Sequence, residues 1–153
     1  MKNTLVKFAF LLILSGMILV SCSKSESDPT PDGGALTVND VTPTNSSIVK
    51  MGMFVSYAHG LGGAAALYVD PAGAKILRFE NFTMSQGPDV YVYLSKANNF
   101  SKANVIEVAK LTDGYSKSNI NFNVTSPSYT TDYKYVLVYC VQYNSLFGNT
   151  ELK

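Results

Sequence analysis

A redox or metal centre in this 153-residue chain would have to draw on few residue types, and Cys140 is the foremost candidate. Residues 135–141 are rich in valine and tyrosine, which predicts a strand covered on both faces. Strand alternation places Val136, Val138, Cys140 and then Gln142 on one side. Because Gln142 is polar, we expect the sulfur to be half sheltered and close to solvent. Such a sulfur suits a metal or haem iron, and a small buried hydrophobe is the alternative role.

Other side chains are weaker candidates for chemistry. His59 follows a predicted strand in a glycine-rich stretch, so it is a second, weak ligand candidate. Met51 and Met53 could be soft axial ligands, but they share a strand face with Val55, which predicts core packing. Asp89 follows Gly-Pro and is expected to be a turn residue whose carboxylate accepts backbone hydrogens. The sequence leaves any metal unknown.

Enzyme signatures are largely missing from the sequence. It contains one histidine and no Cys-x-x-Cys, no Gly-x-Ser-x-Gly and no phosphate-binding glycine loop. The stretch Gly60-Leu61-Gly62-Gly63 follows a strand without opening a helix, so it predicts a hinge or bulge. Whether the protein is an enzyme is left open, and the missing signatures favour a protein that is not one.

The N-terminus carries an export signal. Lys2 and Lys7 precede an apolar run at residues 8–20, which is too short to be a stable membrane span. Leu19-Val20-Ser21-Cys22 resembles the lipobox of bacterial lipoproteins, in which the cysteine becomes the first residue and carries lipid. We therefore expect a signal peptide at residues 1–21 and a lipid membrane as a partner through acylated Cys22. An ordinary cleaved signal is the alternative.

The mature chain would then consist of a tether and one domain. Residues 23–34 are small, charged, proline or glycine, so residues 22–47 are expected to form the lipidated, flexible tether and residues 48–153 the domain. Loss of the two signal-peptide lysines leaves 10 basic against 11 acidic residues, which gives no support for nucleic-acid binding. The expected location is the bacterial cell envelope, as an outer-membrane lipoprotein that is periplasmic or surface-exposed. With Cys22 lipidated, Cys140 has no partner for an internal disulfide.

Short apolar runs recur at roughly ten-residue spacing with turn residues between them, which predicts an all-β domain. We expect a single antiparallel β-sandwich or barrel-like domain. Loop 96–104 could hold one helical turn, and residues 36–38 could form a first short strand. The expected strands are residues 48–57, 64–69, 74–82, 90–94, 105–111, 119–124 and 135–141.

Several landmarks together resemble the electron-transfer DM-thirteen domain family, known beside DOMON domains and in bacterial lipoproteins. The resemblance spans about residues 50–152. It implies a β-rich fold and a redox role for Cys140, as a thiol or by binding a group such as haem. The cofactor is otherwise unknown, and the redox partner protein is unidentified. The landmarks are Gly52-Met53-Phe54, His59-Gly60, residues 77–82, residues 87–95, Val138-Tyr139-Cys140, Phe147-Gly148 and Leu152.

A non-catalytic surface binding or adhesion module is the rival hypothesis, with Cys140 as a structural core residue. The tether and the abundant tyrosines motivate it, since tyrosine-bearing strand faces can bind glycans or protein. An open tyrosine patch would favour binding, whereas buried rings would not. The rings that decide are Tyr91, Tyr93, Tyr135, Tyr139 and Tyr143.

Overall fold

A computed structural model of the chain describes residues 41–153. The expected signal peptide, Cys22, the tether up to residue 40 and the strand expected at residues 36–38 lie outside the described residues. Within residues 41–153 the secondary structure consists of β-strands without an α-helix. Accordingly, this part of the chain contains no helix with the length and apolarity needed to cross a membrane.

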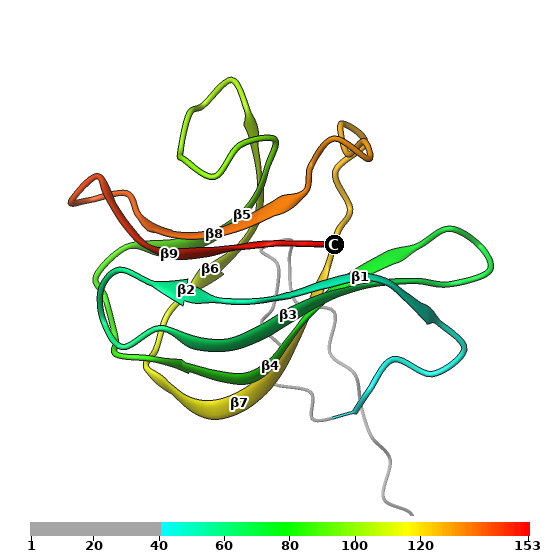
Figure 1. The fold of residues 1–153 in the computed structure, drawn as a ribbon, viewed down its shortest axis with the longest axis horizontal. Helices are drawn as coiled ribbons and strands as arrows, with labels where there is room; N and C mark the ends of the chain where they lie inside the picture. The colour runs from blue at the N-terminus through cyan, green and yellow to red at the C-terminus, as the bar shows by residue number, and fades with distance from the viewer. Residues whose placement is uncertain (1–40) are drawn as a thin grey trace, which may run out of the picture. The chain divides into compact units, whose positions relative to one another are not determined.

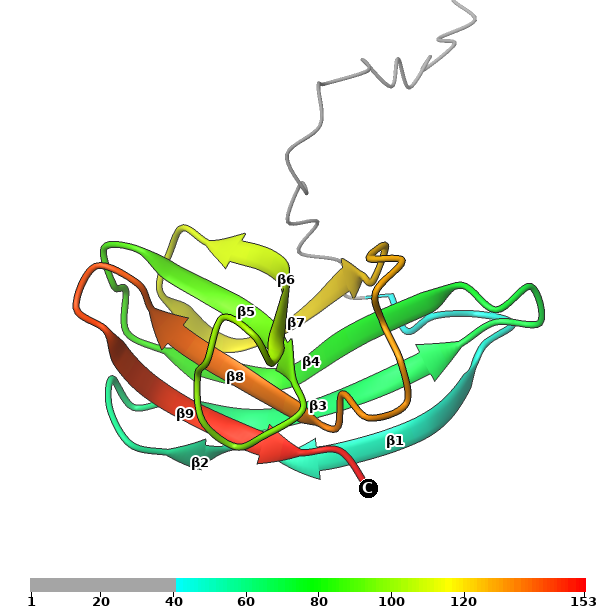
Figure 2. The same cartoon turned by 90° about the horizontal axis from the view of Figure 1, so that it is seen from above.

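The strands form two antiparallel sheets that pack face to face (Figures 1 and 2). The four-stranded sheet has the order β1-β3-β4-β7 and the five-stranded sheet the order β2-β9-β8-β5-β6. The predicted all-β sandwich is thus confirmed, and it is not a closed barrel. The strands are β1 (Ser47–Met53), β2 (Val55–Ser56), β3 (Gly62–Val69), β4 (Lys75–Met84), β5 (Val90–Ser95), β6 (Val105–Leu111), β7 (Tyr115–Asn123), β8 (Tyr135–Cys140) and β9 (Ser145–Glu151).

A turn and a bulge shape the two ends of β3. Asp70 closes the β3–β4 hairpin, since its Oδ1 atom accepts a hydrogen bond from the Ala74 amide at 2.8 Å. The expected bulge in the glycine-rich stretch is present as a register shift between Gly62 and Ala64. It lies where Gly63 has a φ of 104°, a backbone conformation that glycine adopts without strain.

One edge of the sandwich is made by a strand that serves both sheets. β1 pairs with β3 in one sheet, and the chain continues through Phe54 into β2, which pairs with β9 in the other. The backbone amides of Met51 and Lys153 each donate to the other residue's carbonyl at 3.0 Å, so this pairing reaches the C-terminus. Residues 51–56 therefore run antiparallel to residues 148–153.

The core lies between the sheets and is built from alternate strand residues. Phe79 and Phe82 from β4 are fully buried with ring centroids 4.8 Å apart, and the Phe54 ring packs on both. Burying one such side chain contributes about 1.5–3 kcal/mol. In β7 the side chains alternate, because Ile120 and Phe122 are buried while the three asparagines of the strand are half-buried or exposed: Asn119, Asn121 and Asn123.

A second apolar cluster covers the outer face of the five-stranded sheet. It contains Tyr93, Leu137 and Tyr139, packed under loop 96–104. The Phe100 ring of that loop stacks on Tyr139 with centroids 4.0 Å apart and an interplanar angle of 9°. Strand β8 is therefore covered on both faces, as predicted. The loop consists of bends and one turn and does not form the helical turn that it could have held.

The tyrosines do not form an open patch. Tyr93 and Tyr139 are buried, and Tyr91 and Tyr135 are half-buried in the same cluster. Tyr143 is 67% exposed, but it lies in the turn after β8 and not on the strand face. By the criterion set from the sequence, this arrangement counts against binding through a tyrosine face.

The prediction of core packing for Met51, Met53 and Val55 is wrong. Their side chains are 50%, 69% and 53% exposed. The three residues do share one face of the strand, but that face is the outer one, because Phe54 between them points into the core. The row of apolar residues in this strand faces solvent.

Candidate functional site

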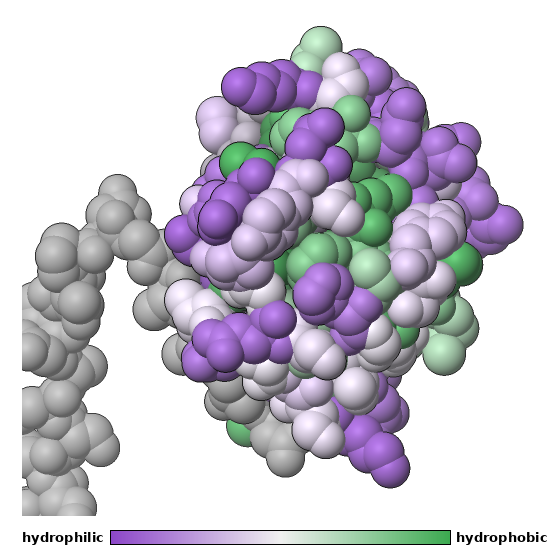
Figure 3. Space-filling view, turned by 90° about the vertical axis from the view of Figure 1, so that its left-hand side faces the viewer, coloured by the Kyte–Doolittle hydropathy of each residue, from purple (hydrophilic) through white to green (hydrophobic). Residues whose placement is uncertain are grey.

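Four connections meet at one end of the sandwich, at the left of Figure 1: residues 57–61, 85–89, 112–114 and 141–144. The Ser85 amide donates to the His59 carbonyl at 2.8 Å, and the Gln86 side-chain amide donates to the Thr112 carbonyl at 3.1 Å. The Val141 amide donates to the Asp89 carbonyl at 2.9 Å. Figure 3 shows this end, with hydrophobic side chains in the middle of the face and hydrophilic ones around them.

Cys140 is the last residue of β8 and lies beneath this end. Its side chain is 0% exposed, so the expectation of a half-sheltered sulfur is wrong. The reason is tertiary: β8 is the central strand of its sheet, Cys140 lies opposite Val90 on β5 and Ser145 on β9, and the second sheet covers its inner face. The predicted sharing of one face with Val136 and Val138 is confirmed.

The Phe147 ring belongs to the core and also contacts two of the connections at this end of the sandwich. It is buried in the same cluster as Cys140, and the exposed His59 imidazole stacks on it with centroids 3.9 Å apart and an interplanar angle of 15°. Gly87 fits against the same ring, because a Cβ atom there would lie 3.0 Å from Phe147 and 2.5 Å from Val90. His59 has a φ of 58°, in the left-handed region that histidine visits more than most residues.

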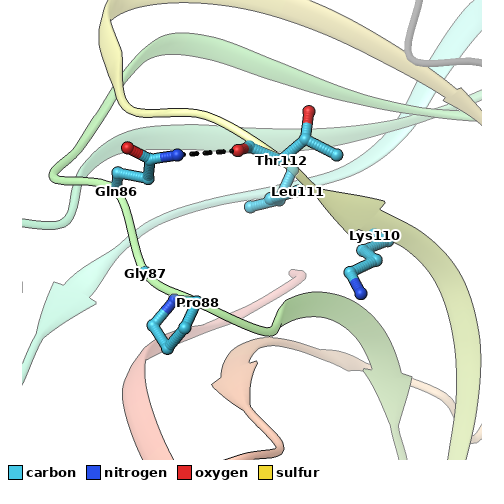
Figure 4. A pocket seen from close by; sticks show the side chains of 6 residues that line it. All are labelled: Gln86, Gly87, Pro88, Lys110, Leu111 and Thr112. Carbon is cyan, nitrogen blue, oxygen red and sulfur yellow. Dashed lines mark hydrogen bonds between the residues drawn. The ribbon is translucent and has the colours of Figure 1, made fainter.

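Asp89 makes an ion pair that was not predicted. Its Oδ1 atom lies 2.8 Å from the Lys110 Nζ atom, so its carboxylate pairs with a lysine rather than serving only the turn. The hydrogen bond to Asp89 raises the pKa of Lys110, and the Lys110 ammonium lies 5.2 Å from the Tyr91 ring centroid. Lys110 and the Gly87–Pro88 turn line an open hollow of about 380 Å³, shown in Figure 4.

The comparison with protein families decides the family. The family model described as Electron transfer DM13 matches residues 53–152. The chain belongs to the DM13 family. At the level of the family, this indicates electron transfer. The comparisons with curated proteins and with solved structures found no match.

Four landmark residues of the DM13 resemblance lie close in space. His59 and Gly87 both pack against Phe147, and the Asp89 carbonyl accepts a hydrogen bond from the residue after Cys140. They do not make a metal centre of the usual kind, since residues 41–153 contain no group of three or more His, Cys, Asp or Glu side chains that could hold a metal ion.

Tyrosines on the outer face of the DM13 domain titrate at high pH. Burial, with a smaller contribution from Glu107, raises the pKa of Tyr93 to about 12. Burial also raises the pKa of Tyr139, whose hydroxyl donates a short hydrogen bond to Asn144. Both phenols therefore stay protonated at neutral pH, and they do not serve as bases there.

Two features of this end were missed from the sequence. The role of Phe147 as the shared contact depends on tertiary packing, and no local pattern signals it. The Asp89–Lys110 pair could have been found by pairing the predicted strands, because Val90 lies opposite Leu111 across the β5–β6 hairpin.

Proposed function

We propose that the protein is an exported electron-transfer lipoprotein, anchored in the bacterial outer membrane through acylated Cys22, with Cys140 as its redox residue. Membership of the DM13 family and the lipobox-like sequence support this proposal. The single structural observation that carries it is the packing of three landmark residues, His59, Gly87 and Phe147, at the end of the sandwich where Cys140 lies.

The burial of Cys140 excludes redox reactions that require contact with the sulfur and leaves one-electron transfer. Thiol–disulfide exchange requires direct approach of one sulfur to another, and a sulfur with 0% exposure is closed to it. Loss of one electron to a partner requires no such contact. In this step the Cys140 thiol passes one electron to an oxidised partner protein and becomes a sulfur-centred radical; the reverse transfer restores the thiol.

A haem bound through Cys140 does not fit the structure. Porphyrin iron needs an opening at the sulfur, whereas Cys140 belongs to the close-packed core between the sheets. The hollow at this end of the sandwich is lined by residues 86–88 and 110–112, and Cys140 is not among them. No step in the proposed function therefore depends on haem.

Electron paramagnetic resonance at low temperature tests the redox role of Cys140, because it requires no reagent to reach the sulfur. The full-length protein, purified in detergent, is oxidised by a photogenerated one-electron oxidant and frozen at once. We expect the signal of a sulfur-centred radical in the wild type and no such signal in Cys140→Val, which keeps an apolar side chain in the core. A signal from tyrosines alone in the wild type would refute the redox role.

An absorption spectrum tests the conclusion about haem separately. Protein produced with haem supplementation should lack a Soret band, because the sulfur offers iron no access. A Soret band in the wild type that disappears in Cys140→Ala would show that the core opens to admit haem.

A structural role for Cys140 in a surface binding module is the second candidate function. Complete burial among valines is the observation that favours it, since free cysteine is among the most buried residue types. This candidate predicts that Cys140→Val leaves every redox measurement unchanged. It also predicts that thiol reagents modify Cys140 only after unfolding.

Anchoring is tested through Cys22. In a Gram-negative host, the wild type should incorporate labelled palmitate and fractionate with the outer membrane. Cys22→Ala should lose both the label and the membrane association, and Cys140→Ala should keep both. Incorporation of the label by Cys22→Ala would disprove acylation at this residue.

A further inference from the structure

Exposed apolar side chains of the described residues gather in one segment of the chain. Nine large hydrophobic residues are exposed within residues 41–153, and seven of them belong to residues 41–57. Strand alternation places four of the seven on the outer side of the strand that runs through β1 and β2, along one side of the sandwich (Figure 2). These four, each 50–69% exposed, form the apolar row: Met51, Met53, Val55 and Tyr57.

Packing on the inner side of the strand keeps the apolar row exposed. The Phe54 ring points inward, with its centroid 4.9 Å from that of Phe79 and 5.7 Å from that of Phe82. A Cβ atom at Gly52 would overlap the Glu151 carbonyl oxygen, so the strand is in close contact with β9 there. The exposure of the row is therefore a fixed property of the fold.

The row and the strand beside it carry no charged side chain. Residues 51–69 contain no Asp, Glu, Lys or Arg. In β3 the small side chains of Ala66 and Ala64 lie opposite Met51 and Met53, so the row stands above its neighbour. An uncharged, apolar row can leave water without the cost of desolvating a charge.

Lysines stand at the rim of the row. An open hollow of about 460 Å³ is lined by Lys153 and Glu151 together with part of the row. The Glu151 carboxylate lies 3.1 Å from the Lys153 ammonium and 3.9 Å from that of Lys134, so its negative charge is compensated. The lysine side chains are 77% and 49% exposed, and their long stems can lie along apolar surface while the ammonium groups reach phosphate.

The chain that precedes the described residues brings a bilayer close to this row. Cys22 and Val41 are 19 positions apart, which spans at most about 65 Å at full extension. Acyl chains on Cys22 would keep the domain within that distance of the membrane. Docking is then an intramolecular step, so a weak contact suffices.

A second copy of the chain fits the row less well than a lipid surface does. Stable protein interfaces use about 20–30 residues on each side, whereas the row has four side chains and is one strand wide. A bilayer needs no complementary shape, and the exposed Tyr57 ring at the end of the row is of a type enriched at membrane–water interfaces.

We propose that the apolar row docks on the bilayer that holds the acyl chains of Cys22, with Lys153 and Lys134 at the level of the headgroup phosphates. This inference rests on the acylation in the proposed function. The docked orientation turns β1 and β2 toward the membrane. It leaves β7, at the other edge of the four-stranded sheet, facing away from it.

Methionine methyl NMR with a spin-labelled lipid tests this orientation. The full-length protein, produced with methyl-¹³C methionine and purified from membranes, is placed in nanodiscs of phosphatidylethanolamine and phosphatidylglycerol that contain a nitroxide lipid. We expect the Met51 and Met53 methyl signals to broaden strongly. The core residue Met84 and a methyl group introduced by Ser116→Met, at an exposed position on β7, should broaden much less.

A charge placed in the row supplies the matched variants. Val55→Asp should reduce the broadening of Met51 and Met53 to the level of the Ser116→Met methyl group, because the row then carries a charge into the lipid. Ser116→Asp adds the same charge at the far edge and should leave the broadening unchanged. The position of the Met84 signal reports whether each variant keeps its fold.

Three results would overturn the proposal. Equal broadening of the row and the Ser116→Met methyl group would mean that the domain has no preferred orientation. Broadening that depends on the number of chains per disc would assign the row to a second copy. Intact mass of the same sample reports the acyl chains on Cys22: their absence overturns the anchoring and the docking together, whereas their presence without broadening overturns the docking alone.

Discussion

Replacement of Cys140 by residues of different size and polarity measures how dry the sulfur's surroundings are. Cys140→Ala removes one atom of about the size of a methylene group from a fully buried site, which costs about 0.8 kcal/mol in transfer and more for the cavity, so about 1–2 kcal/mol in total. Cys140→Ser keeps the volume but buries a hydroxyl among valines, and an unsatisfied hydroxyl costs about 1–3 kcal/mol. Cys140→Val keeps the site apolar but adds one heavy atom to the core, and overpacking of this size costs about 1–3 kcal/mol.

Urea unfolding followed by circular dichroism and tyrosine fluorescence supplies the free energies of unfolding. We expect the wild type to be the most stable and each variant to lose on the order of 2 kcal/mol, or about 8 °C in Tm. Val141→Ala is the control next in the chain; its side chain is 44% exposed, and we expect a change within about 0.5 kcal/mol. If Cys140→Ser were as stable as the wild type, the sulfur would have a polar partner or water beside it, and the argument from burial against disulfide exchange and haem would fail.

Three further perturbations test the packing around the site and the outer cluster. Gly87→Ala places a Cβ atom 2.5 Å from the Val90 side chain, so it should lower the free energy of unfolding by about 1–3 kcal/mol in the same urea assay. Burial raises the pKa of Tyr93 from 10.0 to about 12, so the protonated ring stabilises the fold fully below pH 10, and this stabilisation is lost as the pH rises toward 12. Urea unfolding at a series of pH values should therefore show a loss on the order of 2 kcal/mol in the free energy of unfolding of the wild type, and Tyr93→Phe should lack this loss. Phe100→Ala removes the ring stacked on Tyr139, so loop 96–104 should be cleaved faster by trypsin, with a stability loss of about 2–4 kcal/mol.

Each of these has a result that contradicts it. Unchanged stability in Gly87→Ala would mean that the turn relaxes away from the core without cost. A pH dependence identical in wild type and Tyr93→Phe would assign the alkaline loss to other groups. Protease resistance of loop 96–104 in Phe100→Ala would show that the hydrogen bond from the Asn149 side chain to the Asn98 carbonyl, 2.8 Å long, suffices to hold the loop.

Every strand except β9, together with the Gly-Pro-Asp turn at residues 87–89, could be predicted from the sequence because these elements depend on local signals; no strand was expected at Ser145–Glu151. Alternation of apolar residues and turn-forming Pro, Gly and Asp act over a few residues, and these patterns also placed Cys140 on the face that it shares with Val136 and Val138. The family landmarks could be recognised for the same reason, since they are short runs of residues.

Which face of a strand is buried is not a local property. Met51 and Met53 looked like core residues because they alternate with Val55, yet Phe54 and Gly52 occupy the inner side where this strand passes from one sheet to the other. When both faces of a strand carry apolar residues, packing against distant segments decides which face is buried.

The sequence by itself determined that the chain contains a β domain with one cysteine in an apolar strand. Only the tertiary structure decided that the sulfur has no access to solvent, since this depends on β5, β9 and the opposite sheet closing around it. Only the tertiary structure brought His59, Gly87 and Phe147 together at the end of the sandwich, because residues far apart in the chain meet there when the strands pair.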